Sequence, residues 1–434
     1  MARVLAHRTA EVCSMGMVSL VPSTLVFYRL IYASEPTLAA AICRPTLLAV
    51  CFALFALWCD THIINPERNT FRVLGVLCGA LLVTSAAAAH PGRAIQEWVK
   101  LVAICSIAFM LCRPLRDRSV SRALGIAMVL SSIVLAGMII WTYVRYMGFV
   151  MPTYPAIRVL KGTALDDDNI ALNPLGFECV FTFLCGLCLI RANKFLWGTG
   201  ALLLVISSVL TGSRAPLAVF LVSVIAMLLL NGLRSRSQLV RASAVLGSIG
   251  ITAGAVLGIA IASPQTLSRL TEGRWDLWSV AFHKFEMHPL WGNGYLSVLD
   301  DPTFLPGGYH SEYLTALAEQ GLIGFAAVIY VFVSLLRRCY DMALNSRSRH
   351  PNGQILLFAC LFLMFRALVE LPGLFGTAQG PADFLAYIFL AIAMTRTPAM
   401  EPRSVLSETR GSPIRPAILR PAARGEAVSG EQVY

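Results

Sequence analysis

Apolar runs long enough to cross a bilayer recur along the chain, and they limit the possible folds more than any other feature. A membrane-spanning helix needs about 17–25 mostly apolar residues. Runs of this kind lie at roughly 13–32, 38–58, 71–89, 94–112, 121–144, 170–190, 195–211, 215–231, 242–262, 317–336, 353–371 and 382–396. The pattern predicts an all-α polytopic membrane protein with about twelve transmembrane helices.

Composition supports this prediction. Of 434 residues, 57% are hydrophobic and only 14% are charged, whereas soluble domains carry about 25% charged residues. Most of the surface is therefore expected to face membrane lipids. The formal net charge of +11 does not indicate a nucleic-acid partner, because the chain has neither a long Lys/Arg run nor a soluble domain to present one.

The distribution of arginine predicts the orientation of the helices. The Arg-dense short connections are 113–122, 191–194, 234–241 and 337–350. The short connections on the opposite side, at 33–37, 90–93 and 372–381, hold one Arg and no Lys. Because short cytoplasmic loops carry the excess of positive charge, both termini are predicted to be cytoplasmic. Residues 13–32 are then an uncleaved first membrane helix.

Two long segments remain on the outward side, at about 145–169 and 263–316. We expect them to form periplasmic loops that carry function, the larger one between the ninth and tenth helices. The predicted organisation is a transmembrane domain at 1–397 and a disordered cytoplasmic tail at 398–434, which is rich in Arg, Pro, Gly and Ser. None of the 12 cysteines falls in an outward loop, and the Cys185/Cys188 pair lies inside an apolar helix, where packing is the simpler role.

Basic residues on the outward side run against the positive-inside trend and therefore need a reason. Arg214 lies in the turn TGSRAPL between two apolar helices. A guanidinium at membrane depth usually faces a cavity or a partner. The alternative is an interfacial arginine whose side chain extends to lipid headgroups.

A second group of residues lies in the larger outward loop, in the sequence RWDLWSVAFHKFEMHPLWGNGY that begins at Arg274. Aromatic residues recur here at helical spacing, as in an amphipathic helix on a membrane surface. Pro289 ends the pattern and the following Gly-Asn-Gly predicts a turn. A purely structural surface helix explains the aromatic residues but explains Arg269 and Arg274 less well.

A third candidate is His310, which with Ser311 precedes the tenth membrane helix. Histidine suits general acid–base chemistry near neutral pH, although a hydrogen-bonded residue at a helix start is the alternative. If the helix began this early, 100° per residue would place Glu312 and Glu319 roughly opposite His310.

No metal site is predicted. The acidic stretch Asp166–Asn169 fits a helix N-terminus better than a divalent cation, and His283 and His288 lack a nearby third ligand.

These three segments resemble, in order, the motifs of the O-antigen ligase family of bacterial inner-membrane proteins. TGSRAPL is similar to its T-x-SR element, RWDLW…HPLWGNGY to its Arg-x-x-x-Trp…HPlxGxG element, and HSEYL…EQGLIGF to its third element. The resemblance implies transfer of a glycan from undecaprenyl pyrophosphate to a sugar hydroxyl of lipid A–core at the periplasmic face, with inversion and without metal or another cofactor. The chain departs from the family in having Ser311 where Asn is frequent.

The resemblance also implies roles for individual residues. Arg214 and Arg274 would be the essential arginines and His310 the essential histidine, the arginines stabilising the pyrophosphate leaving group and the histidine accepting a proton. Arg158, Lys161 and Arg269 are candidates for further pyrophosphate contacts.

Three alternatives remain open. An O-antigen polymerase and a protein O-oligosaccharyltransferase share the motifs and differ in the acceptor. A twelve-helix lipid or polysaccharide transporter should instead place ionisable residues inside helices at the membrane midplane. The pair Arg366 and Glu370 has that placement, and an intrahelical ion pair explains it.

Overall fold

The structure is a computed structural model and describes the helices and some of their connections. The described residues are 2–32, 36–59, 68–88, 90–148, 172–190, 194–210, 214–235, 237–261, 274–294, 297, 309–344, 352–369 and 381–395, with residue 236 left out. The predicted tail at 398–434 and most of the loop predicted at 145–169 lie outside them.

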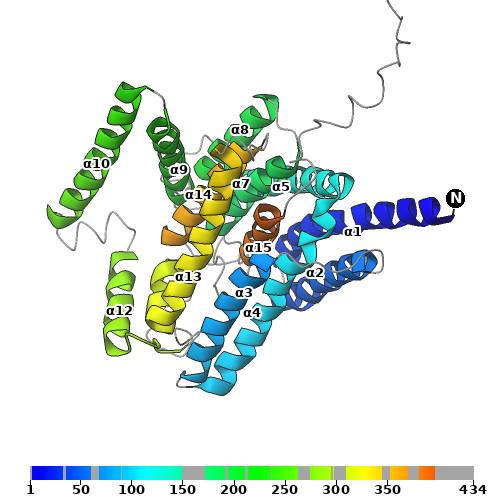
Figure 1. Ribbon diagram of the computed structural model, residues 1–434, viewed down its shortest axis with the longest axis horizontal. Coiled ribbons are helices and arrows are strands. Elements are labelled where there is room, and N and C mark those ends of the chain that lie inside the picture. The colour runs from blue at the N-terminus through cyan, green and yellow to red at the C-terminus, as the bar shows by residue number, and fades with distance from the viewer. Residues whose placement is uncertain are drawn as a thin grey trace, which may run out of the picture. The chain divides into compact units, whose positions relative to one another are not determined.

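Each apolar run predicted from the sequence contains a helix among the described residues. The helices are α1 (Ala2–Tyr32), α2 (Pro36–Cys59), α3 (Arg68–Ala86), α4 (Pro91–Cys112), α5 (Arg118–Met147), α7 (Leu172–Leu189), α8 (Lys194–Leu210), α9 (Arg214–Leu233), α10 (Gln238–Ile261), α12 (Arg274–Met287), α13 (Glu312–Leu344), α14 (Gly353–Val369) and α15 (Pro381–Met394), with a short 3₁₀ helix η1 (Pro114–Arg116) after α4. Figure 1 shows their arrangement. The predicted all-α class is confirmed for this part of the chain, and α12 is the helix predicted in the larger outward loop.

Three segments among the described residues are long and apolar enough to cross a membrane by length and composition. They are Pro91–Arg116, Arg118–Met147 and Glu312–Leu344. Shorter apolar helices accompany them, including Gly353–Val369 and Phe384–Met394. The chain thus has the features of a helical membrane protein.

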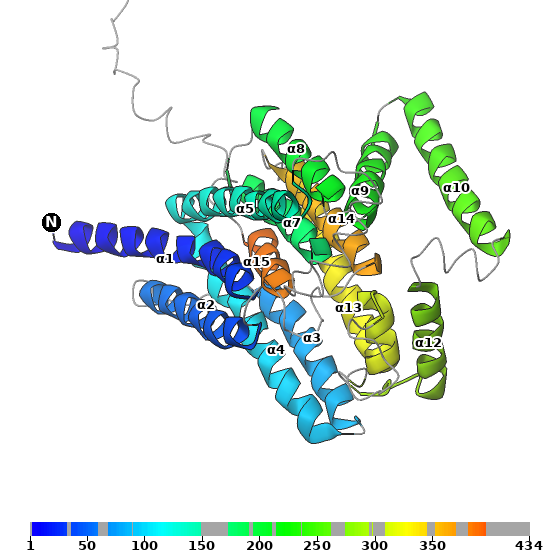
Figure 2. The ribbon, with the colours of Figure 1, turned by 180° about the vertical axis from the view of Figure 1, so that it is seen from behind.

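The most deeply buried helices are α7, α14 and α15. In α15 every residue from Phe384 to Met394 is buried, and this helix packs against α4, α7 and α13. Figures 1 and 2 show α15 among these neighbours from both sides. A helix that is apolar on every face requires such surroundings, which explains why these three segments form the core.

Other helices expose large apolar side chains. Leu239 and Leu246 of α10 are 77% and 68% exposed, and Trp141 of α5 is 69% exposed. Large apolar side chains exposed along these helices are suited to contact with lipid. Where two helices approach closely, small residues replace large ones: a Cβ on Gly186 of α7 would lie 2.8 Å from the carbonyl oxygen of Gly125 of α5.

One buried ion pair ties the end of α1 to α7. Arg29 Nε donates to Glu178 Oε2 over 2.7 Å, its NH2 donates to Oε1, and both side chains are less than 10% exposed. This pair could not be predicted from the sequence, because its members are separated by 149 positions. Bidentate geometry compensates part of the cost of burying two charges.

We expect Arg29→Met or Glu178→Met to lower the free energy of unfolding by about 3–5 kcal/mol, because each leaves the other charge buried without compensation. The double variant Arg29→Met/Glu178→Met should lie close to the wild type. Denaturant unfolding of the purified chain in detergent, followed by tryptophan fluorescence, measures the free energy of unfolding of the wild type, the two single variants and the double variant. A double variant as unstable as the sum of the single variants would contradict the expected coupling.

Candidate functional site

The last turn of α14 is the support on which the candidate site is built. Its final carbonyls cannot bond within the helix and need other donors. Two of them accept from side chains of other segments: Ala367 O from Ser311 Oγ over 3.5 Å, and Val369 O from an Arg274 NH group. One turn earlier, Met364 O accepts from Tyr313 Oη over 3.3 Å. This helix end therefore joins the start of α12 to the start of α13.

His310 lies immediately before α13 in an unusual backbone conformation. Its φ is +49°, the one positive φ among the described non-glycine residues. Such a conformation costs about 1–3 kcal/mol for most residues, and residues of this kind concentrate at functional sites. The condition for the helical-wheel argument is not met, because α13 begins at Glu312 and His310 stands outside the helix. Its side chain is partly exposed.

Ser311 caps the helix that follows His310. Its Oγ accepts from the Leu314 backbone N–H over 3.4 Å, and its carbonyl accepts from the Thr315 N–H over 2.9 Å. Ser and Asn are equally good N-caps. The serine that replaces the family's frequent asparagine therefore preserves the helix start, and with it the position of His310.

Arg274 is the first residue of α12. It is partly exposed, and its guanidinium bonds the carbonyl oxygen of Val369, the last residue of α14. A cation there also interacts favourably with the negative end of the helix dipole. Since Ser311 bonds the carbonyl of Ala367, two residues earlier, the structure brings Arg274 and the segment of His310 to one turn of α14.

The predicted turn after α12 interlocks with a break in α13. Helix α13 is interrupted at Gly321, where φ is +61° and ψ is −160°. Two backbone N–H groups that follow the break donate to carbonyls of the turn. Leu322 N–H donates to Pro289 O over 2.9 Å, and Ile323 N–H donates to Leu290 O over 3.4 Å. In return, Gly294 N–H bonds Glu319 O over 2.7 Å.

Asn293 completes the interlock with its side chain. Its Nδ2 group donates to Lys284 O of α12 over 3.0 Å and to Ala318 O of α13 over 2.9 Å. The motif residues after His288 thus serve to fix α12 against α13, and α12 in turn carries Arg274. Their role in the described structure is to position the site.

Three charged residues of α13 and α14 are buried, and the sequence did not assign them to the site. Glu312 and Glu319 are at most 1% exposed, and Arg366 is 3% exposed. The Arg366 guanidinium lies 5.1 Å from the centre of the Phe177 ring, next to Glu178, a cation–π geometry. Its predicted partner, Glu370, lies outside the described residues. The sequence signal that could have found these residues is the presence of acidic and basic residues near the predicted outward ends of apolar helices.

The remaining predicted site residues are only partly described. Arg214 begins α9, which packs against α14, so its backbone lies on a neighbour of the helix that supports the site. Nothing is described of its side chain. Arg158, Lys161, Arg269 and the stretch Asp166–Asn169 lie outside the described residues. Within the described residues there is no group of three metal-ligating side chains.

The arrangement offers a cation and a potential proton acceptor on a common, hydrogen-bonded support. A guanidinium can bind phosphate oxygens in bidentate fashion, and an imidazole can accept a proton from a hydroxyl group. Comparison with protein families finds that residues 186–329 match the family described as O-antigen ligase. The match spans Arg214, Arg274, His310 and the whole interlock. A comparison with curated proteins found no match.

Proposed function

We propose that the chain, whose residues 186–329 match the family described as O-antigen ligase, is an inverting glycosyltransferase that completes lipopolysaccharide. Its donor would be a glycan on undecaprenyl pyrophosphate, and its acceptor a sugar hydroxyl of lipid A–core. One observation carries the proposal. Within the matched segment, an arginine and a histidine in left-handed backbone are held at the same end of α14.

The proposed setting is the bacterial inner membrane. About twelve helices cross it, both termini lie in the cytoplasm, and the segments around 145–169 and 263–316 face the periplasm. The distribution of arginine in the short loops supports this orientation. The C-terminal end of α14 and the start of α13 then lie at the periplasmic side, where the lipid-linked donor presents its sugar.

Arginine would stabilise the leaving group. As the bond between the anomeric carbon and the phosphate oxygen breaks, negative charge grows on undecaprenyl pyrophosphate. Arg274 and Arg214 would bind this charge, with Arg158, Lys161 and Arg269 as further contacts, and so supply the stabilisation that a divalent cation gives in other transferases. The bond from Arg274 to α14 supports the proposal, because it fixes the guanidinium before substrate arrives.

His310 would act as the general base. It takes the proton from the acceptor hydroxyl while the oxygen attacks the anomeric carbon from the face opposite the pyrophosphate, so the configuration inverts. His310 is partly exposed, and the cap formed by Ser311 supports its position.

The test of the proposed function is reconstitution with lipid-linked O-antigen, lipid A–core and EDTA. We expect glycan joined to lipid A–core and free undecaprenyl pyrophosphate in equal amounts, detected by mass spectrometry. Longer glycans that remain on the lipid carrier would show a polymerase instead, and glycan on a protein Ser or Thr an oligosaccharyltransferase. If vesicles move the lipid-linked glycan without making any covalent product, the protein is a transporter.

A further inference from the structure

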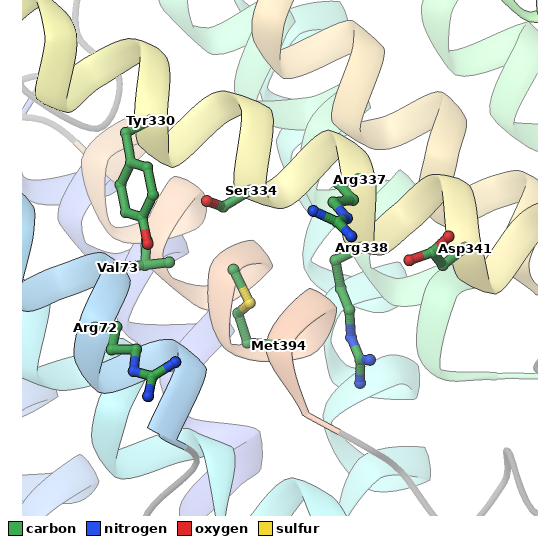
Figure 3. A pocket seen from close by; sticks show the side chains of 8 residues that line it. All are labelled: Arg72, Val73, Tyr330, Ser334, Arg337, Arg338, Asp341 and Met394. Carbon is green, nitrogen blue, oxygen red and sulfur yellow. The ribbon is translucent and has the colours of Figure 1, made fainter.

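A second constellation of charged side chains lies at the opposite end of α13 from His310. It lines a pocket of about 340 Å³ formed by the start of α3, the C-terminal part of α13 and the end of α15. Figure 3 shows Arg72 of α3 and Arg338 of α13 on either side of Met394. Arg337 follows Gly321 by about 24 Å along the helix at 1.5 Å per residue, so this pocket is separate from the candidate active site.

We propose that this pocket binds the phosphate group of an anionic membrane lipid. Three arginines line it, Arg72, Arg337 and Arg338, against one acid among the described lining residues, Asp341. Within the described part of the chain, none of the three guanidinium groups makes a hydrogen bond or an ion pair. Arginine is the residue best suited to recognise phosphate, because its donors form a rigid fork.

Two hydroxyl groups add to the recognition of an anion. Tyr330 and Ser334 line the same pocket on the face of α13 that leads to the arginines. Hydroxyl groups can donate to the ester and free oxygens of a phosphodiester. Val73 and Met394 provide an apolar floor, so the pocket combines polar and apolar walls, as the boundary between headgroup and acyl chain requires.

The apolar surface that continues from the pocket favours a lipid over a soluble phosphate compound. On α3, Val76 and Val83 follow Arg72 at helical spacing and are 46% and 47% exposed. On α13, Val333 precedes Arg337 by one turn and is 53% exposed. Residues at such spacing share one helix face. Each helix therefore presents an apolar face that runs from its arginine into the membrane, along which acyl chains can lie.

The experiment measures lipid binding to the purified full-length chain in detergent by native mass spectrometry. Phosphatidylglycerol is the anionic probe, phosphatidylcholine the neutral lipid, and glycerol 3-phosphate the soluble phosphate. We expect phosphatidylglycerol to bind at least about 10-fold more tightly than phosphatidylcholine. Glycerol 3-phosphate at the same concentration should show no bound adduct.

The double variant Arg337→Gln/Arg338→Gln should weaken phosphatidylglycerol binding by about 10-fold or more. The matched control is Arg234→Gln/Arg241→Gln, which removes two exposed arginines, one just after α9 and one in the first turn of α10, on the same predicted side of the membrane. It should leave binding within about 2-fold of wild type, since these arginines do not line the pocket. If Arg337→Gln/Arg338→Gln does not fold, Arg72→Gln replaces it in the comparison with the control, and the expected loss of phosphatidylglycerol affinity is smaller.

Three results would overturn the inference. An equal loss in both double variants would show that only overall charge matters. Equal affinity for the two lipids, which both carry a phosphodiester, would show that the pocket does not select a lipid of net negative charge. Tight binding of glycerol 3-phosphate would assign the pocket to a soluble ligand. None of these results bears on glycosyl transfer, which is measured separately at the other end of α13.

Discussion

Replacing His310 by Asn is expected to lower glycosyl transfer by about 10²–10⁴-fold, the usual contribution of a general base, while the protein remains folded. Asparagine tolerates the left-handed backbone that His310 adopts, so the substitution removes the proposed proton acceptor without adding backbone strain. The rate of transfer to lipid A–core by purified protein measures the effect, and the unfolding temperature verifies the fold.

The matched control is Ser311→Asn at the next position. Because Asn caps helices as well as Ser does, this variant should retain transfer within about 2-fold of the wild type. If His310→Asn keeps full activity at wild-type stability, the histidine is a structural residue at the helix start and the base lies elsewhere. If Ser311→Asn is also inactive, the effect at His310 would report the helix start and not proton transfer.

Replacing Gly292 by Ala is expected to destabilise the protein by more than about 5 kcal/mol, which would prevent folding. An added Cβ would lie 2.2 Å from the carbonyl carbon of Glu319 and 2.3 Å from the nitrogen of Gln320. Both are backbone atoms that cannot rotate away. The φ of Gly292 is also +71°, which disfavours alanine. The yield of monodisperse protein and its unfolding midpoint in detergent measure the loss.

Gly137→Ala is the control for this prediction. Gly137 lies inside α5 and has no heavy atom within 4 Å of its added Cβ. Since alanine has a higher helix propensity, this variant should be as stable as the wild type or more stable by up to about 1 kcal/mol. A well-folded Gly292→Ala protein would mean that the turn and the break in α13 separate easily, contrary to the interlock described above.

The sequence predicted the helices well because their signal is local. Each apolar run is nearly continuous, and each described run is a helix, as for α5 and α14. The amphipathic helix α12 was predicted from its own periodicity and from Pro289. Which helices are central could not be predicted from these runs, because α15 and α10 are both apolar while only α15 is surrounded by other helices.

The site was predictable in part. Motif order indicated Arg274 and His310, and both lie in segments held by α14. Their common support could not be predicted, because the α14 carbonyls that hold them have no side-chain signature in the sequence. The pair of Arg29 and Glu178 and the ring contact of Arg366 depend on the packing of helices distant in sequence.

The contacts between the turn after α12 and the break in α13 explain why the motifs contain glycines. Gly321 breaks α13, and its added Cβ would lie 2.4 Å from the carbonyl oxygen of Leu290. Gly294 allows the turn to approach Ala88, which follows α3. The glycines of a motif that suggested catalysis in the sequence therefore serve mainly to pack the turn after α12 against α13 and the end of α3.

The last turn of α14 has a consequence for the energetics of the proposed reaction. A catalyst whose charged groups move as the substrate changes must spend free energy on reorganising them, whereas groups fixed beforehand do not. Arg274 and Ser311 bond carbonyls only two residues apart on one rigid helix end, so the arginine and the neighbouring histidine share a fixed frame in the unliganded protein. Part of the entropy loss that aligns the arginine with the proposed base is thus incurred during folding, not in each turnover.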